Sequence, residues 1–170
     1  MRHLIGIVVG LLAASSVWAQ TPLGATDITA AEVQAFLKES PRDRNTDRPI
    51  RVVDVGGYRT AVFGVFRPKV AAVAATVHQT KATEVYYMLE GAGILVTGGT
   101  QSKPATPRPS AMGNWTDIGS TGIDGGTARR VAKGDVVIIP GGVPHSWRSV
   151  EGDLTYLIIR SDPDNQIPLQ

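Results

Sequence analysis

His78 and His145 are the side chains whose types and surroundings suggest chemistry in this sequence. Three histidines occur in the chain, and His3 lies in an N-terminal segment that we expect to be removed. The chain has no cysteine, which excludes a thiolate metal site, a cysteine nucleophile and a disulfide framework. A metal ion would therefore have to be held by nitrogen and oxygen ligands.

His145 ends a run of turn-forming residues with the spacing G-x5-P-x-G-x2-H, formed by Gly134, Pro140, Gly142 and His145. Gly134 opens a turn into an apolar strand, and Pro140 ends the hydrogen bonding of that strand. The glycine at 142 permits a tight reversal of the chain. This pattern predicts that His145 enters the following strand at a fixed place.

The first histidine begins a second pattern, in which His78, Thr80 and Glu84 have the same parity. Alternate residues of a strand point to one face, so these three side chains would lie together, joined by Tyr86 and Met88. The argument requires a regular strand, because a bulge between Thr80 and Glu84 would break the alternation.

Both runs resemble the two sequence motifs of the cupin superfamily. The first is similar to H-x-H followed by Glu and then Gly, and three of these four positions match, with Thr80 in place of the second histidine. Ala72 and Ser149 also depart from the usual pattern. The first motif covers about residues 72–91 and the second about 134–149. The resemblance implies an all-β cupin-type double-stranded β-helix, which is a jelly-roll barrel.

The resemblance also implies a metal site formed by His78, Glu84 and His145. Two imidazoles and a carboxylate suit a divalent transition metal such as Fe, Mn, Ni, Co or Zn, and they leave coordination positions open. Thr80 would hold a metal-bound water or fill the space of the missing imidazole. Strand parity would place Tyr86, Met88 and Trp147 in the pocket wall, together with Thr80. In an enzyme, Tyr86 or a bound water would transfer protons, which makes Tyr86 the candidate catalytic residue.

Two functional classes remain open at this point. The first is a metal-dependent cupin enzyme that acts on a small molecule as an oxygenase, a lyase or an isomerase. The second is a non-catalytic cupin with a degraded metal site that binds or senses a small molecule. Thr80 favours the second class, and the retained His78, Glu84 and His145 favour the first more strongly.

The elements that must position these residues are many short strands after one helix. Thr29 and Glu32 have capping-box spacing, which predicts a helix that ends at Ser40-Pro41. Short Val- and Ile-rich runs predict strands near 50–55, 59–67, 73–80, 84–90, 92–97, 128–131, 135–139 and 153–160. The Gly-, Pro- and Ser-rich insertion of about residues 98–127 is expected to be a lid or loop beside the pocket mouth, anchored by Trp115.

Residues 1–19 have the features of a secretory signal peptide. Arg2 precedes a short apolar stretch, and Val17-Trp18-Ala19 is a small-residue ending. We therefore expect cleavage after Ala19, a single cupin domain over residues 20–170, and a periplasmic or secreted bacterial protein.

Composition narrows the partners of this 170-residue chain. The net charge of +2 is nearly balanced, which argues against nucleic-acid binding, and no apolar run is long enough for a membrane span after cleavage. We expect a small-molecule ligand. A homodimer would form through an exposed sheet edge near residues 50–55 or through the N-terminal helix.

Overall fold

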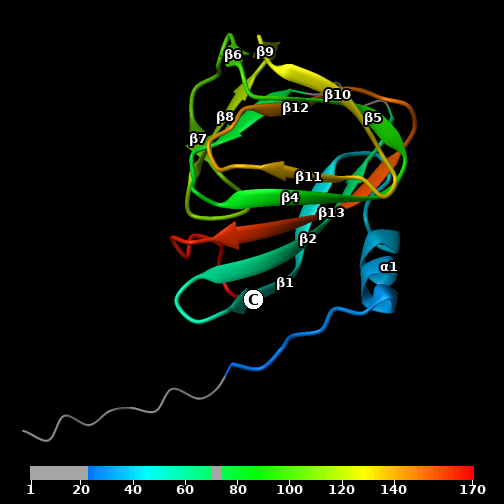
Figure 1. Ribbon diagram of the computed structural model, residues 1–170, viewed down its shortest axis with the longest axis vertical. Coiled ribbons are helices and arrows are strands. Elements are labelled where there is room, and N and C mark those ends of the chain that lie inside the picture. Colours follow the sequence, from blue (N-terminus) through cyan, green and yellow to red (C-terminus); the bar gives the residue numbers. More distant parts are fainter. Residues whose placement is uncertain (1–22, 70–73) are drawn as a thin grey trace, which may run out of the picture.

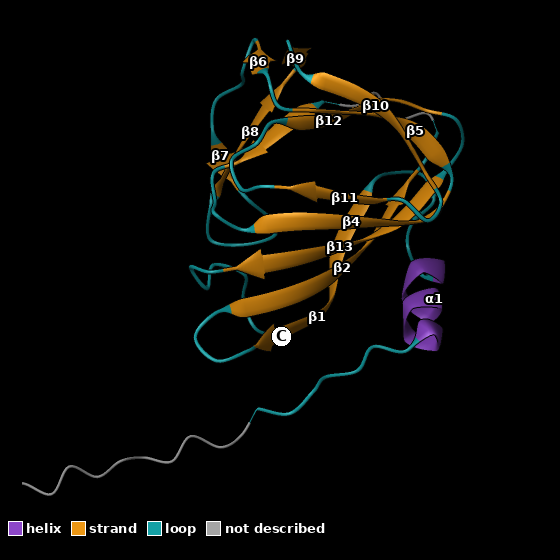
Figure 2. Ribbon diagram, viewed as in Figure 1, coloured by secondary structure: helices purple, strands orange, loops and turns teal. Residues whose placement is uncertain are grey.

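A computed structural model describes residues 23–69 and 74–170, and the expected signal peptide lies outside these residues. Two antiparallel sheets face each other, with a small ribbon at one end (Figures 1 and 2). In spatial order, the first sheet contains β1 (Thr46–Asp54), β2 (Arg59–Arg67), β13 (Leu154–Asp162), β4 (Thr83–Glu90) and β11 (Val136–Ile139). The second contains β10 (Thr127–Ala132), β5 (Ala92–Thr97), β12 (His145–Val150), β3 (Ala75–His78), β8 (Thr116–Ser120) and β7 (Arg108–Pro109). The ribbon pairs β6 (Thr100–Ser102) with β9 (Gly122–Asp124). The two facing sheets confirm the expected all-β jelly-roll fold.

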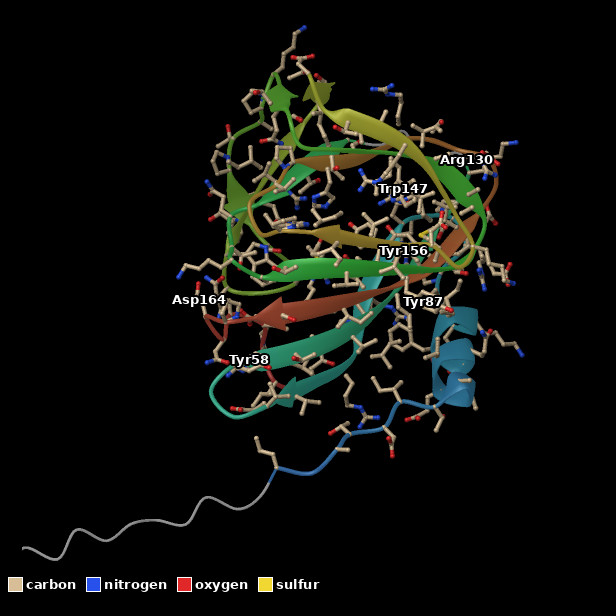
Figure 3. The ribbon with its side chains drawn as sticks, viewed as in Figure 1. Tyr58, Tyr87, Arg130, Trp147, Tyr156 and Asp164 are labelled. Atoms are coloured by element: carbon tan, nitrogen blue, oxygen red, sulfur yellow. The ribbon has the colours of Figure 1, made fainter. Side chains whose placement is uncertain are left out.

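The core lies between the two sheets because their strands alternate apolar and polar residues. In β13, Leu154, Tyr156 and Ile158 are buried, and the residues between them are partly exposed. Trp147 of β12 and Tyr156 of β13 approach each other from opposite sheets in Figure 3. The Trp147 indole donates a hydrogen bond to the Tyr156 hydroxyl at 3.3 Å. Aromatic side chains therefore fill the barrel beside its polar interior.

The single helix of the described chain, α1 (Ala30–Lys38), packs on the outer face of the first sheet. Thr29 and Glu32 form the expected capping box at its start. The Phe36 ring lies against Gly64 of β2, where an added Cβ would come within 2.8 Å of the ring. Across the described residues, we find no helix with the length and apolar character that a bilayer crossing needs.

The insertion differs from the expected irregular loop because it contains the short strands β6, β7, β8 and β9. Strand β8 pairs with β3, so that Ile118 lies opposite Val77 and Asp117 opposite His78. Trp115 is buried, with 6% of its surface exposed. These strands depend on pairing with a distant segment, which a local pattern of Gly, Pro and Ser does not reveal.

The expected strand over 73–80 is also shorter in the structure. Strand β3 ends at His78, and the Thr80 amide donates to the His78 carbonyl at 2.9 Å in a tight turn. Residues 79–82 lie between β3 and β4, so no regular strand relates the Thr80 side chain to those of His78 and Glu84. The shared parity of these residues therefore does not decide where Thr80 points.

Candidate metal centre

His78, Glu84 and His145 come together inside the barrel. One ligand atom from each residue lies within 4.8 Å of the others. Nε2 of His78 is 3.9 Å from Oε1 of Glu84, and Nε2 of His145 is 3.5 Å from Oε2. Ligand atoms bonded to one ion at about 2.1 Å are separated by about 3 to 4 Å. The spacing of these three groups therefore fits a single metal ion.

Each ligand occupies the end of a strand. His78 is the last residue of β3, His145 is the first of β12, and Glu84 is the first inward residue of β4. The turn before His145 packs closely, because a Cβ on Gly141 would lie 2.5 Å from the Thr80 carbonyl oxygen. Gly142 has a φ of +75°, which favours glycine. The second sequence motif thus forms the turn that was expected from its residues.

His145 is oriented by its own turn. Its Nδ1 lies 3.0 Å from the Val143 carbonyl oxygen. A carbonyl only accepts hydrogen bonds, so Nδ1 carries the proton and Nε2 presents its lone pair to Glu84. Burial lowers the pKa of His145, although the Glu84 carboxylate acts in the opposite direction. His145 is therefore in the neutral form that binds metals.

His78 is oriented by the insertion. Its Nδ1 lies 2.6 Å from Oδ1 of Asp117, and the Trp115 indole donates to the same oxygen at 3.0 Å. Burial raises the pKa of Asp117, but its hydrogen bond with His78 and the charge of that residue lower it more. An ionised Asp117 fixes the His78 proton on Nδ1 and leaves Nε2 free, as in many carboxylate–histidine–metal sites.

Glu84 is held by Arg160, a buried cation of β13. The Arg160 guanidinium contacts Oε1 of Glu84 at 2.7 Å, and the same nitrogen, Nη2, lies 2.8 Å from the Asp47 carboxylate. The Tyr86 hydroxyl donates to Oε2 at 3.3 Å. Burial raises the pKa of Glu84, but Arg160 and the two histidines outweigh it and lower the pKa to about 2. Glu84 is therefore ionised at neutral pH.

The donor atoms of the site also suit a divalent cation. Arg160 is a positive group, and Asp47, Glu84 and Asp117 are negative groups in contact with it or with the histidines. Two imidazole nitrogens and a carboxylate oxygen are suitable ligands for a divalent transition metal. The residues present thus match such an ion in geometry and in ligand type.

A cavity of about 390 Å³ leads to the two histidines. Its wall includes Tyr86 and Trp147, as the sequence suggested for both. Met88 does not line this cavity and is buried in the core, with 1% of its surface exposed. Thr80 lines neither of two cavities that contain His78 and His145, and its hydroxyl donates to the side-chain oxygen of Gln166 at 2.6 Å. The structure therefore groups Tyr86 and Trp147 with the site but does not bring Thr80 or Met88 to it.

Sequence reasoning missed Arg160, Asp47 and Asp117. One signal for Arg160 was present, since it continues the inward alternation of Leu154, Tyr156 and Ile158 along β13. A charged residue at an inward position needs a buried partner. The chain offers no comparable local signal for Asp117 or Asp47. Asp117 reaches the site through pairing of β8 with β3, and Asp47 meets Arg160 because β13 pairs with β2.

A model of the cupin family matches residues 59–170 of the sequence. The chain belongs to the cupin family. The match includes all three ligand positions of the site, and the barrel described above is the double-stranded β-helix expected of a cupin.

Several solved structures are similar to this cupin in fold. The DMSP lyase DddQ from Ruegeria pomeroyi DSS-3 is 17% identical over 88% of this chain and 81% of its own, with a TM-score of 0.48. An uncharacterized conserved protein with a double-stranded beta-helix domain from Klebsiella pneumoniae is 15% identical over 85% of this chain and 97% of its own, with a TM-score of 0.48. The protein TT1209 from Thermus thermophilus is 14% identical over 76% of this chain and 93% of its own, with a TM-score of 0.46. A search of curated protein sequences gave no significant match.

Proposed function

We propose that this cupin is a metal-dependent enzyme that acts on a small molecule in the periplasm, as an oxygenase, a lyase or an isomerase. The observation that carries the proposal is the convergence of His78, Glu84 and His145, with both Nδ1 atoms engaged and both Nε2 atoms facing Glu84. Maintaining this arrangement inside a barrel requires buried charges, which a binding pocket without a metal would not need.

A divalent metal in this site would act as a Lewis acid on a substrate oxygen or support redox chemistry with dioxygen. The protein groups would orient the substrate and hold its protons. Burial, and after it the charge of Glu84, raises the pKa of Tyr86 well above its ordinary value. Tyr86 therefore keeps its proton at neutral pH. Because its hydroxyl donates this proton to Oε2 of Glu84, its oxygen is available to accept a hydrogen bond from a substrate in the cavity.

The alternative is a cupin that binds or senses a small molecule without catalysis. One observation favours it: the Arg160 guanidinium already occupies Oε1 of Glu84, so this carboxylate has an internal cation as partner. In that case the charge of Arg160 would satisfy Glu84, and the two histidines would only line the pocket.

Metal content separates the two proposals. Protein purified from its native compartment should contain close to one equivalent of a transition metal by plasma mass spectrometry. His78→Ala, His145→Ala and Glu84→Gln should each lose most of it, because each removes a ligand. Glu90→Gln is the matched control, since Glu90 lies at the exposed end of the same strand in a pair with Lys133. Equal metal content in the ligand variants and the wild type, or no metal in any of them, would favour the binding protein.

Export is tested independently. N-terminal sequencing of protein from the periplasmic fraction should begin at Gln20, or be blocked there if Gln20 has cyclised. A chain that begins at Met1 in the cytoplasm would contradict this part of the proposal.

A further inference from the structure

The cavity that leads to the metal centre contains two arginines that have no acidic partner among the described residues. Arg67 is the last residue of β2 and continues the inward alternation of Ala61, Phe63 and Val65. Its Nε atom is buried and makes no hydrogen bond within the described chain. Arg108 of β7 is exposed at the same cavity and lies opposite Asp117 in strand register, but its side chain makes no ion pair or hydrogen bond within the described chain. A buried donor without an acceptor is costly unless a bound molecule supplies one.

The acidic groups of this cavity are already engaged. Asp47 is paired with Arg160, and Asp117 accepts from Trp115 and lies within hydrogen-bond distance of His78. Arg160 in turn is satisfied by Asp47 and Glu84. In the part of the wall that the structure describes, the side chains of Arg67 and Arg108 are thus left without an ion-pair partner.

We propose that the small molecule taken up by this cavity is an organic anion, whose carboxylate or phosphate group is bound by Arg67 and Arg108. The planar guanidinium presents paired N–H donors that match two oxygens of such a group. The role of this anion as substrate rests on the proposed function, but its binding does not. A volume of about 390 Å³ is sufficient for a small molecule.

The rest of the ligand would have a short, partly apolar carbon skeleton. The remaining wall of the cavity includes side chains that are mostly carbon, namely Val65, Met112, Trp147, Tyr156 and Ile158. The anionic group would therefore be bound at one part of the wall, and the reactive part would extend over these side chains toward the metal ligands.

The test is binding of defined anions to the protein after removal of metal with EDTA. The probes are acetate, succinate and glycerol phosphate, each compared with its neutral counterpart acetamide, succinamide or glycerol. Isothermal titration calorimetry measures affinity, and intrinsic tryptophan fluorescence, to which Trp147 in the cavity wall and Trp115 both contribute, reports occupancy. At least one anion should bind while its neutral counterpart does not, and the probe that binds identifies carboxylate or phosphate as the group.

Variants at the two arginines locate the site. Arg67→Gln and Arg108→Gln should each weaken binding of that anion about tenfold or more, as expected when one charged hydrogen-bonding partner is removed. Arg67→Lys, which retains the charge without the paired donors, should show a smaller loss. Arg148→Gln is the control, because Arg148 is exposed on β12 and does not line the cavity. Thermal unfolding confirms that each variant is folded.

Failure of this inference can be distinguished from failure of the proposed function. The inference is overturned if none of the three anions binds, if the neutral counterparts bind equally well, or if both glutamine variants bind like the wild type. Metal content is measured on the same preparations before EDTA treatment. Anion binding by a protein that never contained metal would support the anion site and contradict the proposed metal-dependent enzyme. A protein that contains metal but binds no anion would support the proposed enzyme and overturn the anion site.

Discussion

The two histidines of the site face the same carboxylate but are held by different parts of the molecule. His145 is oriented by the Val143 carbonyl, two residues away in its own turn. His78 is oriented by Asp117, which is 39 residues away in the insertion and is itself held by Trp115. One support belongs to the backbone of a short motif, and the other is made of side chains brought by a separate strand.

This difference affects how each histidine responds to mutation. The carbonyl that supports His145 exists whatever side chain occupies position 143, so only a change in the backbone of the turn can disturb it. The support of His78 can be removed by one substitution in β8. The barrel motifs alone therefore do not complete the site, since the insertion supplies the partner of one ligand.

Acid should have the largest effect, because it acts on Glu84, the carboxylate shared by both histidines. The pKa of Glu84 is lowered to about 2 from 4.5 in the folded protein. The stabilisation by its ionised form is therefore complete above about pH 4.5 and is lost as pH falls toward 2. Urea unfolding of the metal-free protein should show a loss on the order of 3 kcal/mol from this group. In Glu84→Gln the free energy of unfolding should depend less on pH in this range, whereas Glu90→Gln should behave like the wild type. The same pH dependence in both variants would contradict the prediction.

The support of His145 should be sensitive to the backbone of its turn. Gly141→Ala places a Cβ 2.5 Å from the Thr80 carbonyl oxygen, so the turn must shift. We expect a loss of about 2 kcal/mol in the free energy of unfolding, together with weaker metal binding. Gly152→Ala, where nothing lies within 4 Å of the added Cβ, should change stability by less than about 0.5 kcal/mol. Equal stability of the two variants would show that the turn adapts.

The support of His78 should be sensitive to one side chain. Asp117→Asn removes the charge that fixes the proton on Nδ1 of His78, and metal affinity should fall about tenfold or more. Asp124→Asn is the control, because Asp124 lies exposed in β9 of the same insertion. Zinc titration against a competing chelator measures both variants. Unchanged affinity in Asp117→Asn would mean that the insertion does not support the site.

The smallest effect on metal affinity is expected at Trp115, which contacts Asp117 rather than a candidate ligand. Trp115→Phe retains most of the apolar contact but removes the N–H that donates to Oδ1 of Asp117. Metal affinity should fall about threefold, less than in Asp117→Asn, because the carboxylate itself remains. The same zinc titration compares the loss of affinity in the two variants. A larger loss in Trp115→Phe than in Asp117→Asn would contradict the prediction.

The sequence by itself determined the features that depend on neighbouring residues. The capping box predicted the helix, the strand alternation placed Glu84 and Tyr86 on one face, and the glycines and prolines before His145 predicted its turn. The cupin motifs that carried the fold assignment have the same local character. Such patterns can be recognised in the sequence because backbone preference and side-chain direction depend on residues only a few positions apart.

Only the tertiary structure decided which groups surround the three ligands. Asp117 meets His78 through the register of β8 on β3, and Arg160 meets Glu84 from 76 residues away through the register of β13 on β4. The end of β3 at His78 likewise turned Thr80 toward Gln166. Strand register is set by packing of the whole barrel, and a local pattern does not contain it. The three candidate ligands could therefore be proposed from the sequence, whereas the residues that contact them could not.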